Sequence, residues 1–177
     1  MRLFIAAEIP MEIREMLACA SASLRVPGIR LVGRENMHFT LAFIGELEEG
    51  RLEDAMSAID RAEVVPFEIE VAGMGCFRDG KVIYVQAARG REEASRLAMS
   101  IRSELALMGI NFDGRKFVPH VTVARINGGF GGQALQRAVK SFEGEVFGSF
   151  TLSSVSLFRS VLAKEGTAYM RLYERKA

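Results

Sequence analysis

Apolar and polar side chains along the chain repeat with two different periods, which predict strands and helices in turn. Apolar residues at every second position over 3–9 predict a half-buried strand, and helical spacing over 11–24 predicts an amphipathic helix. The segment Val26-Pro27-Gly28 ends that helix. By the same criteria we expect further strands over 37–44, 67–71, 82–85, 120–126, 147–158 and 168–173, and further helices over 52–59, 94–108 and 133–142. The pattern therefore indicates a fold that mixes helices and strands.

The order of these elements contains an internal duplication. Residues 38–44 (HFTLAFI) match residues 120–126 (HVTVARI) at an offset of 82, and residues 67–71 match residues 150–154 at an offset of 83. Upstream of each matched strand stand a strand, a long helix and a loop. This duplication predicts an α+β fold of two lobes related by a pseudo-twofold axis. We expect antiparallel sheets to line a central groove, helices to lie outside, and residues 1–177 to form one domain of two intertwined lobes.

Composition and charge narrow the classes of function. The 177 residues are 49% hydrophobic and 25% charged with a net charge of +1, which is typical of a globular protein and not of a nucleic-acid binder that works by bulk positive charge. No apolar run approaches the roughly 18 residues of a membrane span, and the first apolar stretch is too short for a secretory signal. Two cysteines are too few for a disulfide framework. We therefore expect a cytoplasmic monomer with no membrane partner.

The two histidines of the chain, His38 and His120, both lie in the duplicated strand, and each is two residues before a threonine. Positions i and i+2 of a strand point to the same face, so His38 projects with Thr40 and His120 with Thr122. One such motif alone is a frequent coincidence in a half-buried strand. Because both histidines fall at the same place in one repeat, we predict that the four side chains converge on a functional site in the groove.

Paired imidazoles suit acid-base catalysis. With unperturbed pKa values near 6.5, one ring acts as a neutral base while the other acts as a protonated acid. A threonine hydroxyl donates a hydrogen bond to a phosphoryl oxygen on which charge builds. Neither motif contains a cysteine or an acidic residue, and two histidines are fewer than the three or four ligands of a usual metal site. We therefore expect a site without metal or cofactor that acts on an activated phosphodiester.

The sequence resembles a known family at these motifs. Residues 35–45 (ENMHFTLAFIG) and 117–125 (FVPHVTVAR) are similar to the paired HxTx motifs of the 2H phosphoesterase superfamily. More narrowly, the chain resembles the RNA 2',3'-cyclic phosphodiesterase family, also called 2'-5' RNA ligase. The first residues (RLFIA) and residues 66–69 (PFEI) extend the similarity over nearly the whole length.

The resemblance implies an activity and a set of roles. Members hydrolyse an RNA-terminal 2',3'-cyclic phosphate to a 2'-phosphate without metal. By motif position, His38 is expected to protonate the departing 3' oxygen and His120 to activate water, while Thr40 and Thr122 hold the phosphate. Expected partners are RNA with 2',3'-cyclic phosphate ends or small cyclic nucleotides.

Arg125 matches an arginine that often follows the second motif of this family. Strict alternation puts its side chain on the face opposite His120, so it reaches a phosphate only if the strand ends or bulges there. Otherwise it is an exposed charge at a strand end. Arg115, Lys116 and Phe117 are further candidates for RNA contact, with a solvated loop or the core as the alternatives. Members of this family commonly have a tryptophan before the first motif, where this chain has residues 30–32 (RLV).

Other functions remain open at this point. A second member of the superfamily that opens small cyclic nucleotides or cleaves 2'-5' linkages has the same groove chemistry, and 2'-5' ligation is that chemistry reversed. A non-catalytic RNA-end binder does not need an acid and a base. A metallohydrolase that uses both histidines is distinguished by its sensitivity to chelators. Finally, residues 128–132 (GGFGG) lack the Lys-Ser/Thr of a phosphate-binding loop and are expected to form a connector.

Overall fold

The computed structural model describes residues 1–77, 80–127, 132–163 and 166–177. Its helices are α1 (Met11–Ala22), α2 (Leu52–Arg61), α3 (Arg91–Leu107) and α4 (Gln133–Lys140). Its strands are β1 (Arg2–Glu8), β2 (Ile29–Leu31), β3 (His38–Glu46), β4 (Phe67–Cys76), β5 (Val82–Arg89), β6 (His120–Ile126), β7 (Val146–Leu152), β8 (Ser154–Ala163) and β9 (Gly166–Lys176). The connector expected over 128–132 lies, apart from Gly132, outside the described residues.

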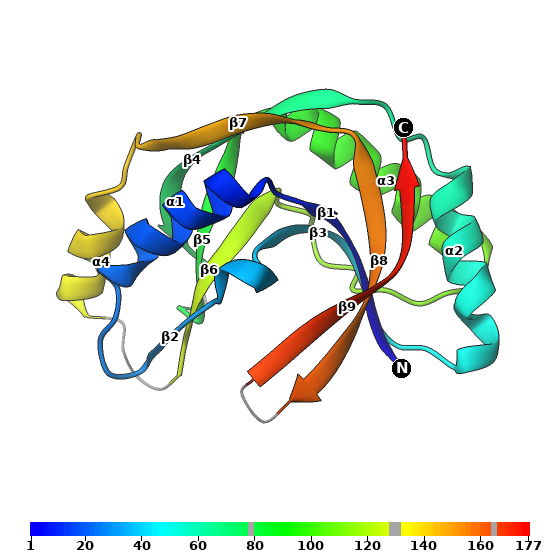
Figure 1. Cartoon of the computed structure of the whole chain (residues 1–177), viewed down its shortest axis with the longest axis horizontal. Coiled ribbons are helices and arrows are strands. Elements are labelled where there is room, and N and C mark those ends of the chain that lie inside the picture. The colour runs from blue at the N-terminus through cyan, green and yellow to red at the C-terminus, as the bar shows by residue number, and fades with distance from the viewer. Residues whose placement is uncertain (78–79, 128–131, 164–165) are drawn as a thin grey trace.

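The strands form one curled antiparallel sheet in the order β7-β4-β5-β6-β3-β1-β8-β9, with β2 added to β6 (Figure 1). The predicted α+β class and antiparallel architecture are therefore confirmed. The two expected sheets are continuous with each other, because β3 of one half pairs with β6 of the other.

Two details of the sheet differ from the sequence prediction. The expected strand over 147–158 is two strands, since β7 pairs with β4 and β8 pairs with β1. The chain crosses between the halves of the molecule at Ser153, and apolar periodicity does not record such a change of partner. The three-residue strand β2 was not predicted, because three residues are too few to show a period.

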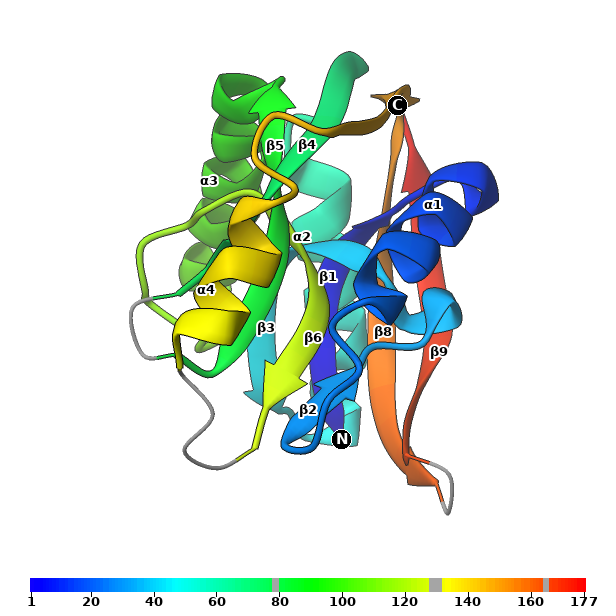
Figure 2. The same ribbon diagram turned by 90° about the vertical axis from the view of Figure 1, so that its left-hand side faces the viewer.

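Helices cover the sheet in two pairs (Figures 1 and 2). Helices α2 and α3 contact each other and reach β3, β8 and β9, whereas α1 and α4 contact β4, β6 and β7. The buried face of α3 consists of the apolar positions expected at helical spacing, which are Ala94, Leu97, Ala98, Ile101 and Leu105. These side chains join those of the strands in a large apolar core, so the strands are held rigidly from one side.

The duplication is visible in the pairing of the sheet. Phe39 of β3 pairs with Val121 of β6, its own counterpart at an offset of 82. On the two sides of this pair, β1 corresponds to β5 and β8 corresponds to β4 in the order of the sheet. Equivalent residues of an antiparallel pair face each other only where a twofold axis passes between them. The predicted pseudo-twofold axis therefore runs between β3 and β6.

Candidate active site

The two histidines lie beside the pseudo-twofold axis, one residue from the pair Phe39–Val121. Both are half-buried, as are Thr40 and Thr122, whereas the intervening Phe39 and Val121 are buried in the core. Each His-x-Thr motif thus points its polar side chains to one face of the sheet, as predicted from strand alternation.

That face of the sheet forms a groove of about 1160 Å³. Four of the predicted site residues line it, namely His38, Thr40, Thr122 and Arg125. His120 does not line this volume directly, and its ring packs edge-on against Phe77 and Tyr84 at centroid distances of 4.9 and 5.5 Å. A positive charge on His120 lowers the pKa of His38, so protonation of one ring disfavours protonation of the other.

Backbone carbonyl groups orient both rings in the same way. Nδ1 of His38 lies 2.7 Å from the carbonyl oxygen of Asn36, and Nδ1 of His120 lies 2.6 Å from that of Val118. A carbonyl oxygen only accepts, so each Nδ1 carries the proton and each neutral ring keeps a lone pair on Nε2. Nε2 of His38 lies 3.0 Å from Oγ1 of Thr40. The duplication has therefore preserved the orientation of each imidazole as well as its position.

Burial and nearby cations keep both rings neutral. Burial lowers the pKa of His38 to about 4, and the charges of Arg14, His120 and Arg125 act in the same direction. The pKa of His120 is also lowered, first by burial and then by Arg125. Each site histidine therefore holds an unprotonated Nε2 at neutral pH until an anion approaches.

Aromatic side chains surround His38 on the groove face. The rings of Phe4 and His38 stack with centroids 4.8 Å apart, and Tyr169 lies edge-on at 5.2 Å. Phe158 completes this apolar surrounding at 6.4 Å. Desolvation by these rings explains why the pKa of His38 falls so far.

A β-bulge brings Arg125 to the groove. Between β5 and β6, Tyr84 pairs with Thr122 and Ile83 with Ala124, which leaves Val123 as an extra residue. The extra residue reverses the alternation, and Arg125 lines the groove on the same side as Thr122. The bulge required by the sequence interpretation is therefore present. The first half has the same bulge at Leu41, which brings Phe43 to the groove in the equivalent position.

A polar side chain stands opposite each histidine, and the sequence analysis missed both. Glu8 of β1 pairs with His38, and Gln86 of β5 pairs with His120. The offset between these residues is 78 and not 82, so comparison of the duplicated motifs did not reveal them. The register of β1 and β5 is set by hydrogen bonding to β3 and β6, which the sequence pattern does not encode.

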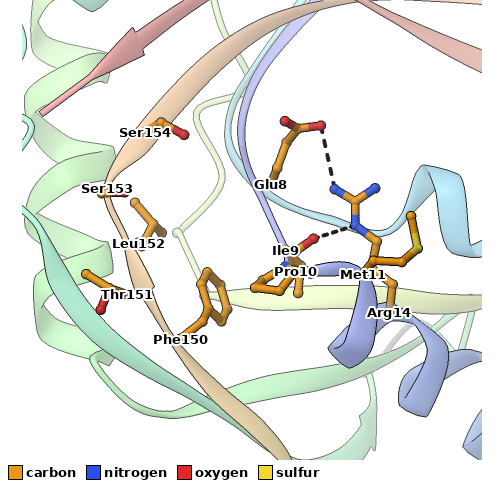
Figure 3. Close-up of a pocket in the computed structure, with 10 residues that line it drawn as sticks. All are labelled: Glu8, Ile9, Pro10, Met11, Arg14, Phe150, Thr151, Leu152, Ser153 and Ser154. Atoms are coloured by element: carbon orange, nitrogen blue, oxygen red, sulfur yellow. Dashed lines mark hydrogen bonds and ion pairs between the residues drawn. The ribbon is translucent and has the colours of Figure 1, made fainter.

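An arginine from the following helix holds each of these side chains. Arg14 donates from Nε to the carbonyl oxygen of Ile9 at 2.6 Å, and its Nη2 lies 3.6 Å from Glu8 (Figure 3). Arg91 donates from Nε to the carbonyl oxygen of Ala87 at 3.3 Å and from Nη2 to Gln86 at 3.0 Å. The two arrangements correspond closely, except that a carboxylate faces His38 and a neutral amide faces His120.

Figure 3 shows the hollow next to this first arrangement, between the end of β1 and the junction of β7 and β8. It measures about 410 Å³ and is lined by Glu8, Arg14 and residues 150–154, with neither histidine on its walls. Its polar side chains are the Glu8–Arg14 ion pair and three hydroxyl groups, with no imidazole, so we place the candidate active site in the larger groove.

The structure gives less support to an RNA contact by the three candidates before the second motif, Arg115, Lys116 and Phe117. Phe117 packs against the core with the guanidinium of Arg102 5.4 Å from its ring. Arg115 forms an ion pair with Asp113, and Lys116 is exposed. In the described ranges, no three His, Cys, Asp or Glu side chains form a metal-binding group, and no helix is long and apolar enough to cross a membrane.

Comparison with known proteins gives a consistent result. The family model described as LigT like Phosphoesterase matches the chain twice, over residues 3–84 and 85–169. The RNA 2',3'-cyclic phosphodiesterase of Aeropyrum pernix is 33% identical over 84% of this chain and 86% of its own length. That of Methanothermobacter thermautotrophicus is 30% identical over 95% and 94%. The crystal structure of Escherichia coli LigT complexed with 3'-AMP superimposes with a TM-score of 0.84 at 26% identity, covering 99% of this chain and 97% of that one.

Proposed function

Because this chain belongs to the LigT-like phosphoesterase family, we propose that it hydrolyses the 2',3'-cyclic phosphate at the end of an RNA to a 2'-phosphate, without metal or cofactor. Relatives of similar length carry the name RNA 2',3'-cyclic phosphodiesterase. The observation that carries the proposal is the pair of histidines beside the pseudo-twofold axis, each with Nδ1 fixed by a carbonyl group and Nε2 available for proton transfer.

The reaction needs one proton taken up and one delivered. In our proposal His120 accepts a proton from a water molecule at Nε2 while the water oxygen bonds to phosphorus. The bond from phosphorus to the 3' oxygen breaks, and His38 donates the proton on its Nε2 to that oxygen. The products are a 2'-phosphate and a 3'-hydroxyl group. Exchange with solvent then returns the proton from His120 to His38.

His38 must gain a proton before it acts as the acid. Its lowered pKa leaves it neutral in the free protein. A cyclic phosphate carries a negative charge, and an anion beside an imidazole raises its pKa. Substrate binding therefore charges the ring that delivers the proton.

The remaining residues act on the phosphate itself. The Thr40 hydroxyl, now beside Nε2 of His38, turns to the phosphate and donates to a non-bridging oxygen, as does that of Thr122. Arg125 lines the same groove, and its positive charge favours the binding of an anionic substrate. All of these side chains come from one chain, so the reaction requires no second subunit, in keeping with the monomer expected from the sequence. A cytoplasmic location is likewise part of the proposal.

The test uses a short RNA that ends in a 2',3'-cyclic phosphate, incubated with the protein in excess EDTA. The 2'- and 3'-phosphate products are separated, and the variants His38→Ala and His120→Ala are assayed alongside. A 2'-phosphate product that disappears with either variant supports the proposal. A 3'-phosphate product reverses the assigned leaving group, and activity that returns only on addition of metal refutes metal-independent hydrolysis. With no turnover under either condition, small cyclic nucleotides and 2'-5' linkages become the candidates.

A further inference from the structure

Strand β2 brings a second arginine to the groove. Arg30 pairs with Arg125 across the antiparallel β2 and β6, and residues directly opposite each other project to the same face. Both side chains are exposed and line the groove. Two guanidinium groups therefore stand together on the wall that continues from Thr122.

Within the described part of the chain, this arginine pair has no carboxylate partner. Like charges directly opposite each other destabilise a sheet, and neither guanidinium has a carboxylate of the described residues within 4.0 Å. The two acidic side chains that line the groove have other partners. Glu46 lies 3.4 Å from the α-amino group of Met1, and Glu35 accepts a hydrogen bond from Asn36. An anionic ligand would supply the missing charge.

The arginine pair lies at a distance from the histidines that suits a second phosphate group. Arg125 follows Val121 by four residues and one bulge, which corresponds to about 10 Å along the strand. Adjacent phosphates of an extended strand lie somewhat closer together than this, and the long arginine side chains cover the difference. Phe43 takes the equivalent position in the other half, where the guanidinium of Arg2 lies 5.2 Å from the centre of its ring, so the directly opposed pair of arginines occurs on one side of the pseudo-twofold axis.

We propose, on the basis of the function proposed above, that Arg30 together with Arg125 binds the internucleotide phosphate that precedes the terminal nucleotide. The preferred substrates are then oligoribonucleotides with a cyclic phosphate end, in preference to nucleoside 2',3'-cyclic monophosphates. Arginine suits this role, because its planar guanidinium group binds a phosphate through two parallel hydrogen bonds.

The experiment compares adenosine 2',3'-cyclic monophosphate with a trinucleotide that ends in 2',3'-cyclic phosphate. The values of kcat and KM are measured for the wild type, for Arg30→Gln and for Arg30→Lys. Arg61→Gln is the matched control, since Arg61 is an exposed arginine at the end of α2 that does not line the groove. We expect the wild type to favour the trinucleotide in kcat/KM by about tenfold or more, mainly through KM.

Arg30→Gln should reduce this preference about tenfold. It should also lower the slope of log Kd against log salt concentration for the trinucleotide by about one. Arg30→Lys should restore part of the preference. The control should keep the wild-type preference. Equal kcat/KM values for the two substrates in the wild type overturn the inference, while leaving the proposed hydrolysis intact. The inference is also overturned if Arg30→Gln lowers kcat/KM equally for the two substrates, because Arg30 then acts at the reacting phosphate. Hydrolysis of neither substrate refutes the proposed function itself.

Discussion

Phe39 and Val121 face each other across β3 and β6, and each directly follows one of the two histidines in the sequence. This pairing places equivalent residues of the two repeats on opposite sides of a pseudo-twofold axis. One duplicated strand therefore supplies both halves of the site, with two imidazoles of the same orientation near one point. The surroundings of the two rings differ, and the predictions below follow from those differences.

Loss of either imidazole should reduce catalysis without unfolding the protein. We expect His38→Gln and His120→Gln each to lower kcat by about 10²- to 10⁴-fold, because each removes one proton transfer. Steady-state kinetics on the cyclic phosphate RNA measure the effect, and circular dichroism checks the fold. A variant that keeps more than a tenth of the wild-type kcat does not fit paired acid-base roles.

The pH optimum of kcat/KM should lie on the acidic side of 6.5. Burial lowers the pKa of His38 to about 4 and also lowers that of His120, so the singly protonated pair is most populated in acid. The optimum of kcat should lie at higher pH, because the bound phosphate anion raises these pKa values. Values of kcat and kcat/KM measured from pH 4 to 9 test this prediction, and a kcat/KM optimum above pH 7 contradicts it.

Stability should fall in acid because of the same buried ring. The unfolded chain protonates His38 near pH 6.5, whereas the folded protein does so near pH 4, so the free energy of unfolding decreases between these values. The decrease amounts to up to about 3 kcal/mol. Urea unfolding at pH 7 and pH 4.5 measures it, and His38→Gln should show a smaller decrease than the wild type. Equal decreases in the two proteins rule out His38 as the cause.

A carboxylate introduced opposite His120 should make the two halves more alike. Glu8 pairs with Arg14 and Arg171 and does not shift the pKa of His38, whereas Gln86 has Arg91 as its partner, so in Gln86→Glu we expect the pKa of His120 to rise. Titration of the histidine signals by NMR measures the change directly. Gln86→Met is the matched variant without charge and should not raise this pKa; a rise of similar size in Gln86→Met points to altered burial.

Gly75 should be important for the site through its contact with Tyr84. A Cβ atom at this position comes within 2.8 Å of the ring of Tyr84, and Tyr84 packs against His120. We expect Gly75→Ala to displace the tyrosine and to lower kcat about tenfold or more, since small displacements of a catalytic group are costly. The double variant Gly75→Ala, Tyr84→Phe lacks the hydroxyl oxygen, which is one of the close contacts of this Cβ atom, and should recover part of the lost kcat. Unchanged kcat in Gly75→Ala shows that the ring moves without affecting His120.

The sequence by itself determined the repeat, the strands that carry it and the faces on which His38, Thr40, His120 and Thr122 project. These features depend on local periodicity, because strand alternation fixes which side chains share a face. The resemblance of the HxTx motifs to a known family was confirmed by the comparison with that family. The roles of the individual residues stay predictions.

Only the tertiary structure decided which strands lie together and in which register. The pairing of Phe39 with Val121, the bulge that turns Arg125 into the groove and the position of Arg30 opposite Arg125 all depend on hydrogen bonds between segments distant in the sequence. A register changes with every bulge, and apolar periodicity does not specify where a bulge forms. For the same reason Glu8 and Gln86 became visible as neighbours of the histidines only once the sheet was assembled.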